Sequence, residues 1–158
     1  MERIYDKKKI ADCIAGSKYH DVLEASDIDF YLTRYEKGEL VSSPFEKELL
    51  FRIVEQGSIH ICLIRDDGTR YSLSNGATDY FLGDMEIFYP RSNNIYAEAA
   101  ENLLCISFSI EKYKEKLLSD PRFLALICKS LSAKIGTMTT MDAEPASLTE
   151  RVISYMKY

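Results

Sequence analysis

The stretch FRIVEQGSIHICLIRDDGTRYSLSNGATDYFLGDMEIF, from Phe51 to Phe88, alternates short apolar runs with breaks that contain glycine. Its strand-like runs, the first of which starts two residues earlier, cover residues 49–55, 58–65 and 69–74, and a fourth short run precedes residue 83. The breaks are Gln56-Gly57, Asp66-Asp67-Gly68, Asn75-Gly76 and Gly83. Alternating apolar residues cut by glycine-containing turns indicate a meander of short antiparallel strands.

Further strands and helices are predicted on both sides of this meander. Strands are expected at residues 28–35, 40–41, 95–99 and 103–108. A helix is expected from Asp6 to Gly16, and Ser109 is a good N-cap for a helix at 111–118. Asp120 followed by Pro121 is a strong start for another helix, which we expect to run to about Met141.

The helix at 121–141 carries an apolar seam. Its members recur at spacings of three, four and seven residues: Leu124, Ile127, Cys128, Leu131, Ile135 and Met138. A helix of roughly 30 Å with this repeat favours a partner helix, and therefore a dimer. The alternative is that the seam packs on the strands of its own chain. Lys134 and Gly136 dilute the repeat.

The last residues resemble a linker followed by a new helix. Residues 142–146 have linker composition, and Ser147 with Glu150 has the spacing of a capping box. Apolar residues then recur on one face up to Tyr158. We expect this helix to be the first element of a further domain.

Composition sets broad limits on function. The chain has 158 residues, a net charge of −5 and scattered basic residues, which argues weakly against a nucleic-acid-binding surface in this segment. No apolar run is long enough to span a bilayer and no signal sequence is recognisable, so a cytoplasmic location is expected. The four cysteines form no CxxC pair and are expected to act as small buried hydrophobes: Cys13, Cys62, Cys105 and Cys128.

The order of strands, with Gly57, Gly68 and Gly83 at the turns, resembles the effector domain of the CRP/FNR family of bacterial transcription regulators. The resemblance covers roughly residues 28–158. It implies a mainly β fold with flanking helices, namely a jelly-roll-like cyclic-nucleotide-binding roll (a double-stranded β-helix) of about eight strands. It divides the chain into an N-terminal helical segment (1–27), the roll (28–118), a dimerisation helix (119–141), and a linker with the start of a winged helix-turn-helix domain (142–158).

The resemblance also implies a ligand site. The family's phosphate-binding cassette begins with Phe-x-Gly-Glu, which matches residues 81–84 here, with aspartate in place of glutamate. The family's phosphate-neutralising arginine falls on an asparagine, which cannot neutralise a phosphate charge or offer a bidentate fork. The tentative ligand-binding residues are Gly83, Asp84, Met85, Glu86, Arg91, Asn93, Asn94, Ser130 and Lys134. Cyclic AMP is therefore not the expected effector.

The implied function is effector sensing and dimerisation within a transcription regulator. The predicted dimer interface consists of Leu124, Ile127, Leu131, Ile135 and Met138. The implied partners are a second copy of the chain, an unknown small-molecule effector, and DNA bound through a C-terminal domain outside this sequence; no membrane partner is expected.

The sequence leaves other interpretations open. A stand-alone binding or interaction domain would share the same roll, and Gly83, Asp84 and Glu86 would then be purely structural. A cupin-like metalloenzyme also has a small jelly roll, but it needs metal ligands on neighbouring strands, and the only histidines are His20 and His60. No Gly-x-Ser-x-Gly, P-loop or Gly-x-Gly-x-x-Gly occurs. The sequence predicts no cofactor, no metal and no enzymatic activity.

Overall fold

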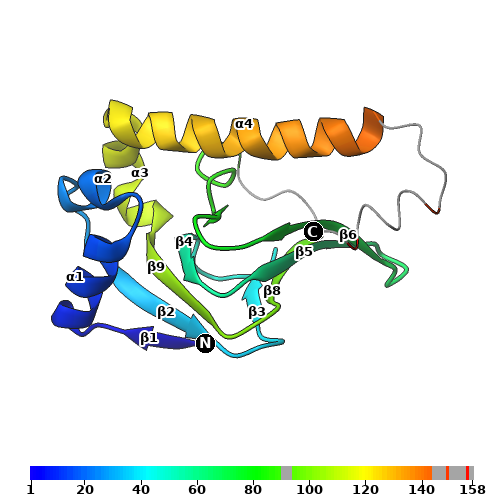
Figure 1. Cartoon of the computed structure of the whole chain (residues 1–158), viewed down its shortest axis with the longest axis horizontal. Helices are drawn as coiled ribbons and strands as arrows, with labels where there is room; N and C mark the ends of the chain where they lie inside the picture. The colour runs from blue at the N-terminus through cyan, green and yellow to red at the C-terminus, as the bar shows by residue number, and fades with distance from the viewer. Residues whose placement is uncertain (90–93, 144–148, 150–155, 157–158) are drawn as a thin grey trace.

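The computed structural model describes residues 1–89, 94–143, 149 and 156, which form two antiparallel sheets with shorter helices at one end and a long helix along the top (Figure 1). One sheet has the order β1 (Glu2–Ile4), β2 (Tyr31–Tyr35), β9 (Leu103–Ser109), β4 (Leu50–Gln56), β7 (Phe81–Leu82). The other has the order β3 (Leu40–Ser42), β8 (Ile95–Ala99), β5 (Ile59–Ile64), β6 (Arg70–Gly76). The predicted mainly β, jelly-roll-like fold with flanking helices is confirmed.

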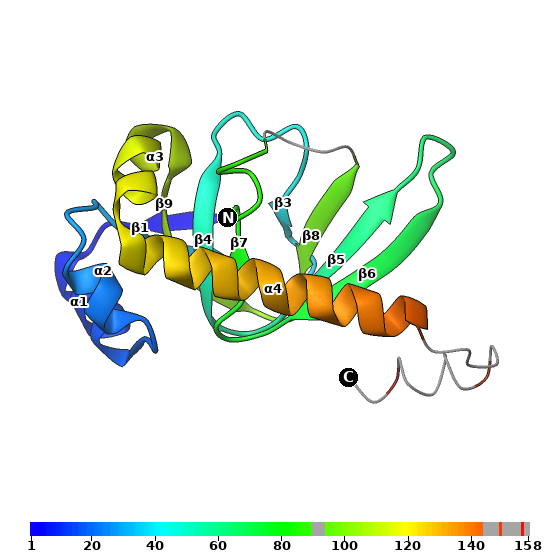
Figure 2. The same cartoon turned by 90° about the horizontal axis from the view of Figure 1, so that it is seen from above.

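Within the described residues, the helices that flank the sheets are α1 (Lys7–Gly16), α2 (His20–Glu24), α3 (Ile110–Ser119) and α4 (Pro121–Ala143). Two of the predicted helix starts are confirmed by their caps. Ser109 Oγ accepts a hydrogen bond from the backbone N–H of Lys112 at 3.4 Å, and Asp120 Oδ1 accepts one from Arg122 at 2.9 Å. These side chains satisfy N–H groups that have no partner within the helix. The long α4 crosses over the roll (Figures 1 and 2).

Three local features differ from the sequence interpretation. The short edge strand β1, which pairs with β2, and the helix α2 were not predicted. The pair Asn75-Gly76 does not form a turn; it ends β6, where Gly76 lies opposite Ile59. The chain turns directly after it, over residues 77–80, where the N–H of Tyr80 donates to the carbonyl of Ala77 at 3.0 Å. Asn-Gly signals a hairpin only when the strand pairing ends there, and here the pairing continues.

The strand β9 separates two apolar cores because its side chains alternate between faces. Ile106 and Phe108 lie in the core between the five-stranded sheet and the helices. Leu103 and Cys105 lie in the core between the two sheets. The predicted burial of Cys62 and Cys105 is confirmed, whereas Cys128 on α4 is exposed. Burial of a large apolar side chain contributes about 1.5–3 kcal/mol, so both faces of β9 stabilise the fold.

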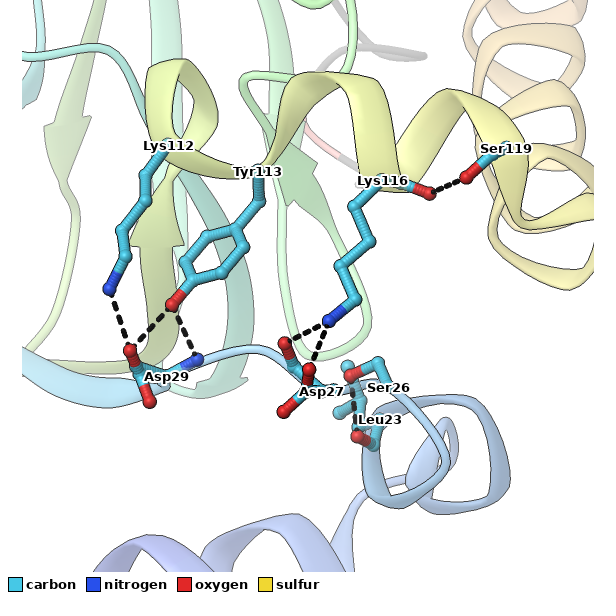
Figure 3. A network of polar contacts seen from close by, with 8 residues as sticks. All are labelled: Leu23, Ser26, Asp27, Asp29, Lys112, Tyr113, Lys116 and Ser119. Carbon is cyan, nitrogen blue, oxygen red and sulfur yellow. Dashed lines mark hydrogen bonds and ion pairs between the residues drawn. The ribbon is translucent and has the colours of Figure 1, made fainter.

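Polar contacts fix α3 against the segment between α2 and β2 (Figure 3). Lys116 Nζ donates to Asp27 Oδ2 at 2.6 Å, and Lys112 Nζ donates to Asp29 Oδ2 at 2.6 Å. The hydroxyl of Tyr113 donates to Asp29 Oδ2 at 2.7 Å and accepts from the backbone N–H of Asp29 at 3.0 Å. The two lysine pairs are exposed and stabilise little, so Tyr113, which is buried, is the main attachment.

Gly57 occupies a tight position between β4 and β5. Its φ is +87°, and a Cβ there would lie 2.3 Å from the carbonyl oxygen of Asn102. Gly68 has a similar φ of +82°, but a Cβ at Gly68 would meet no other atom within 4 Å. Comparing substitutions at the two glycines therefore separates the free-energy cost of a positive φ from the cost of a steric clash.

We expect Gly57→Ala to lower the free energy of unfolding by more than about 2 kcal/mol, because backbone strain and a steric clash add together. Gly68→Ala, the matched control, should cost only about 1 kcal/mol. Urea denaturation followed by circular dichroism measures both. Equal losses in the two variants would show that the contact with Asn102 is unimportant.

Candidate functional site

The turn after β7 is the part of the chain that matches the start of the predicted cassette. Gly83 begins it with a φ of +92°, and a Cβ there would lie 2.4 Å from the carbonyl oxygen of Leu50, so only glycine fits without strain. In the family that the sequence resembles, the cassette continues as a short helix; here it is a hydrogen-bonded turn, in which the N–H groups of Phe88 and Tyr89 both donate to the carbonyl of Met85. A single turn provides no helix N-terminus at which an anion would bind.

Asp84 lies at the centre of the site and is 1% exposed. Lys134 on α4 donates from Nζ to both carboxylate oxygens, at 2.7 and 2.8 Å. Ser130, one turn earlier on α4, donates from Oγ to Asp84 Oδ2 at 2.7 Å. The helix period places both donors on one face, opposite the turn. We call Asp84, Ser130 and Lys134 the helix latch, since they join the turn to α4.

Two further groups surround the Lys134 ammonium. The carbonyl oxygen of Phe81 accepts a hydrogen bond from it at 2.8 Å, and the ring of Tyr80 lies with its centroid 4.5 Å away. A cation near an aromatic face and a buried carboxylate is stabilised by both. Tyr80 was not among the residues predicted from the sequence. Tyr80 directly precedes the Phe81–Asp84 match in sequence. Its contact with Lys134 arises only because α4 packs across the roll.

Glu86 lies in the same turn and is half-buried. Burial raises the pKa of its carboxyl above the ordinary 4.5, and the neighbouring charge of Asp84 raises it further, while Lys134 acts in the opposite direction. Glu86 therefore takes up a proton more readily than an exposed glutamate does.

The remaining predicted ligand residues are not part of this cluster. Met85 is 52% exposed at the surface of the turn. Asn94 lies beside the β5–β6 hairpin, where its side-chain amide donates to Asp66 Oδ1 at 3.2 Å and its carbonyl accepts from the N–H of Ile64. Arg91 and Asn93 lie outside the described residues. The structure thus brings together Gly83, Asp84, Ser130 and Lys134, with Glu86 nearby.

The face of α4 that packs on the roll includes part of the predicted dimer seam. Ile127 is 0% exposed and packs with Phe123 in the chain's own core, and Leu131 packs against the same core. Ile127 is therefore a core residue, as in the alternative interpretation of the seam. Ile135 is 61% exposed and Leu124 is half-buried, so these two retain accessible surface. The side chain of Met138 lies outside the described residues.

The helix latch is satisfied by its own chain. Each oxygen of Asp84 already accepts a hydrogen bond from α4, so a ribose hydroxyl would have to displace Ser130 or Lys134 to bind there. Among the described residues, no group of three His, Cys, Asp or Glu side chains is arranged to hold a metal. His60 is instead paired across strands with Asn75, at 2.6 Å between Nδ1 and Oδ1. In the same part of the chain, no helix is long and apolar enough to cross a membrane.

Comparison with solved structures identifies the fold. The chain resembles the c-di-GMP-responsive global regulator CLP of Xanthomonas campestris, with a TM-score of 0.70, 19% identity, and coverage of 81% of this chain and 66% of CLP. It resembles a CooA mutant of Carboxydothermus hydrogenoformans with a TM-score of 0.62 and 15% identity, covering 92% of this chain and 93% of CooA. It resembles CprK in complex with o-chlorophenolacetic acid with a TM-score of 0.58 and 25% identity, covering 71% of this chain and 46% of CprK.

These three proteins are CRP/FNR regulators, and the likeness confirms the predicted cyclic-nucleotide-binding-like roll followed by a helix. The chain spans about half the length of CprK and just under two-thirds of the length of CLP. No family model matches the sequence, and no curated protein matches it.

Replacing Lys134 tests the helix latch. We expect Lys134→Met to lower the free energy of unfolding by about 3 kcal/mol, because Asp84 would remain buried without its counter-charge. Lys129→Met is the matched control, since Lys129 is exposed on the same helix, and it should change stability by less than about 0.5 kcal/mol. Chemical denaturation measures both, and similar values for the two variants would contradict the latch.

Proposed function

We propose that this chain is the effector-sensing and dimerisation domain of a CRP/FNR-type transcription regulator that does not respond to cyclic AMP. In this proposal residues 28–118 form the sensing roll and residues 119–141 the dimerisation helix. The observation that carries it is the helix latch, which links the turn after β7 directly to α4. A molecule that binds at the turn and pairs with Asp84 or Lys134 would therefore also alter the polar contacts that attach α4 to the turn.

The latch suggests how an effector acts. An anionic group that pairs with Lys134 would compete with the Asp84 carboxylate, and α4 would lose two of its polar attachments to the turn. The apolar contacts of Phe123 and Ile127 would keep the first half of the helix in place. The effector would thus shift the second half of α4 relative to the roll. Its preference for the shifted position of the helix is the differential interaction that a population shift requires.

The fold likeness supports a regulator more strongly than a metalloenzyme. The structures that resemble this chain are regulators; CLP is responsive to c-di-GMP, and CprK is seen in complex with o-chlorophenolacetic acid. A small acid also suits a site in which Lys134 is the central cation and Tyr80 supplies an aromatic surface. In this proposal, DNA binding is a property of the full regulator and not of the roll or α4.

Calorimetric titration of the chain tests the effector. We expect no binding of cyclic AMP or cyclic GMP at millimolar concentration, because the cassette's arginine position holds an asparagine and Asp84 is paired with Lys134. Binding at low micromolar concentration would contradict this. The same titration with o-chlorophenolacetic acid and c-di-GMP extends the test, and a signal that Lys134→Met abolishes would assign the effector to the latch.

Sedimentation velocity tests the dimer. We expect the chain to sediment as a dimer and Ile135→Lys to dissociate it, because Ile135 is a large apolar side chain that is 61% exposed on α4. Lys129→Glu, on the same helix, serves as the charge-changing control and should leave the dimer intact. A monomeric native chain, or a dimer that persists in Ile135→Lys, would contradict the predicted interface.

A further inference from the structure

The space between the two sheets has an apolar part and a polar part. The apolar part is the core around Leu103 and Cys105. The polar part lies on the same face of β2, β9 and β4, where Tyr31 is opposite Ser107 and Ser107 is opposite Arg52. Thr33, two residues after Tyr31, shares a hydrogen bond of 2.7 Å with Ser107 between their hydroxyl groups. Polar groups thus occupy positions where a strand of this roll would ordinarily bury apolar ones.

Arg52 is the charged member of this group and is 1% exposed. Its Nη2 donates to Glu46 Oε1 at 2.6 Å, and its Nε donates to the hydroxyl of Tyr35 at 2.9 Å. A guanidinium in this environment requires an anion, because burial of an unpaired charge is very unfavourable. Its neighbours in sequence, Phe51 and Ile53, point to the opposite, apolar face.

The anion comes from a loop rather than from the sheets. Residues 43–49 join β3 to β4, and we call this segment the strap. Glu46 of the strap pairs with Arg52, and Glu48 pairs with Arg3 of β1 at 2.7 Å. Between the start of the strap and Glu46, Phe45 is 79% exposed. At its end, Leu49 packs against the apolar core and its carbonyl accepts from the N–H of Ile110 at 2.9 Å. Before Leu49, the two carboxylates pair the strap with the roll while Phe45 faces solvent.

A second buried group in this region lacks a partner. The hydroxyl of Tyr31 is buried and, among the described residues, has no hydrogen-bond partner. Burial is the main reason that its pKa rises to about 12, while the charges of Arg3 and Arg52 lower it. A buried hydroxyl without a partner costs about 1–3 kcal/mol. An acceptor that reached both Tyr31 and Arg52 would remove that cost.

We propose that the polar part of the space between the sheets is a second binding site, for a small organic carboxylate. In the structure, the carboxylate of Glu46 occupies the position that this ligand would take. The incoming carboxylate would accept from Arg52 and Tyr31, and Glu46 would move with the strap into solvent. One carboxylate replaces another, so the buried charge is unchanged by the exchange. The two sites share no residue, although the charge of Glu46 acts on Glu86 in the turn that carries Asp84. The proposal stands whether or not the helix latch senses an effector.

Chemical rescue tests the site. We expect Glu46→Ala to lower the melting temperature, and acetate or formate to restore it with a saturable concentration dependence, whereas chloride at the same ionic strength should not. Glu48→Ala is the matched control, because it removes the other strap carboxylate and leaves Arg52 paired. The double variant Glu46→Ala/Arg52→Met should show no rescue, since it lacks the guanidinium.

Three results would overturn the proposal: no rescue of Glu46→Ala, equal rescue of Glu48→Ala, or rescue that survives Arg52→Met. If Glu46→Ala does not fold in chloride, its refolding yield in acetate against chloride becomes the readout. Glu46→Ser, a less severe truncation, repeats the comparison. A yield that does not depend on carboxylate in either variant would count against the site.

The native chain provides an independent measurement. Hydrogen exchange of residues 43–49 is expected to accelerate in acetate and not in chloride, because the external carboxylate releases the strap. Residues 103–109 of β9 serve as the internal reference and should not change. A strap that exchanges at the same rate in both salts, up to molar acetate, would show that Glu46 is a permanent part of the core.

Discussion

The ion pair between Lys134 and Asp84 couples the long helix to the roll. The two residues are far apart in sequence, and they meet only because α4 crosses the roll above the turn that follows β7. Asp84 is 1% exposed, so its charge requires a partner, and Lys134 is held by both carboxylate oxygens, by Phe81 and by Tyr80. The position of the helix and the state of the turn are therefore not independent.

This coupling divides α4 into two parts. The first part is attached by apolar packing, with Phe123 and Ile127 in the core under the helix. The second part has Leu131 against the edge of that core, and its attachment to the turn consists of the polar contacts of Ser130 and Lys134, which a competing ion or hydrogen-bonding molecule can replace. Apolar packing responds little to solutes, whereas polar contacts of this kind are selective for charge and geometry. A helix attached in both ways can remain docked at one end and respond at the other.

The central sheet explains why the roll contains two candidate sites. The face of β9 that carries Ile106 and Phe108 supports the helices, and the face that carries Ser107 lines the space between the sheets. The second face is polar near Arg52 because that guanidinium needs Glu46 and Tyr35. Each of the two ion pairs, Lys134 with Asp84 and Arg52 with Glu46, involves a segment that is not itself a strand.

Local sequence was enough to predict the strand meander, the helix caps at Ser109 and Asp120, and the turn at Gly57, because these features depend on neighbours within a few residues. Resemblance to a known cassette and helix also grouped Asp84, Ser130 and Lys134 in one site. The strand β1 could not be predicted, since its three residues form a strand only by pairing with β2. The partners of Ile127, Lys134 and Arg52 likewise became clear only when distant segments packed together. A charged or apolar side chain has many acceptable partners in a sequence, and the packing of distant segments selects one of them.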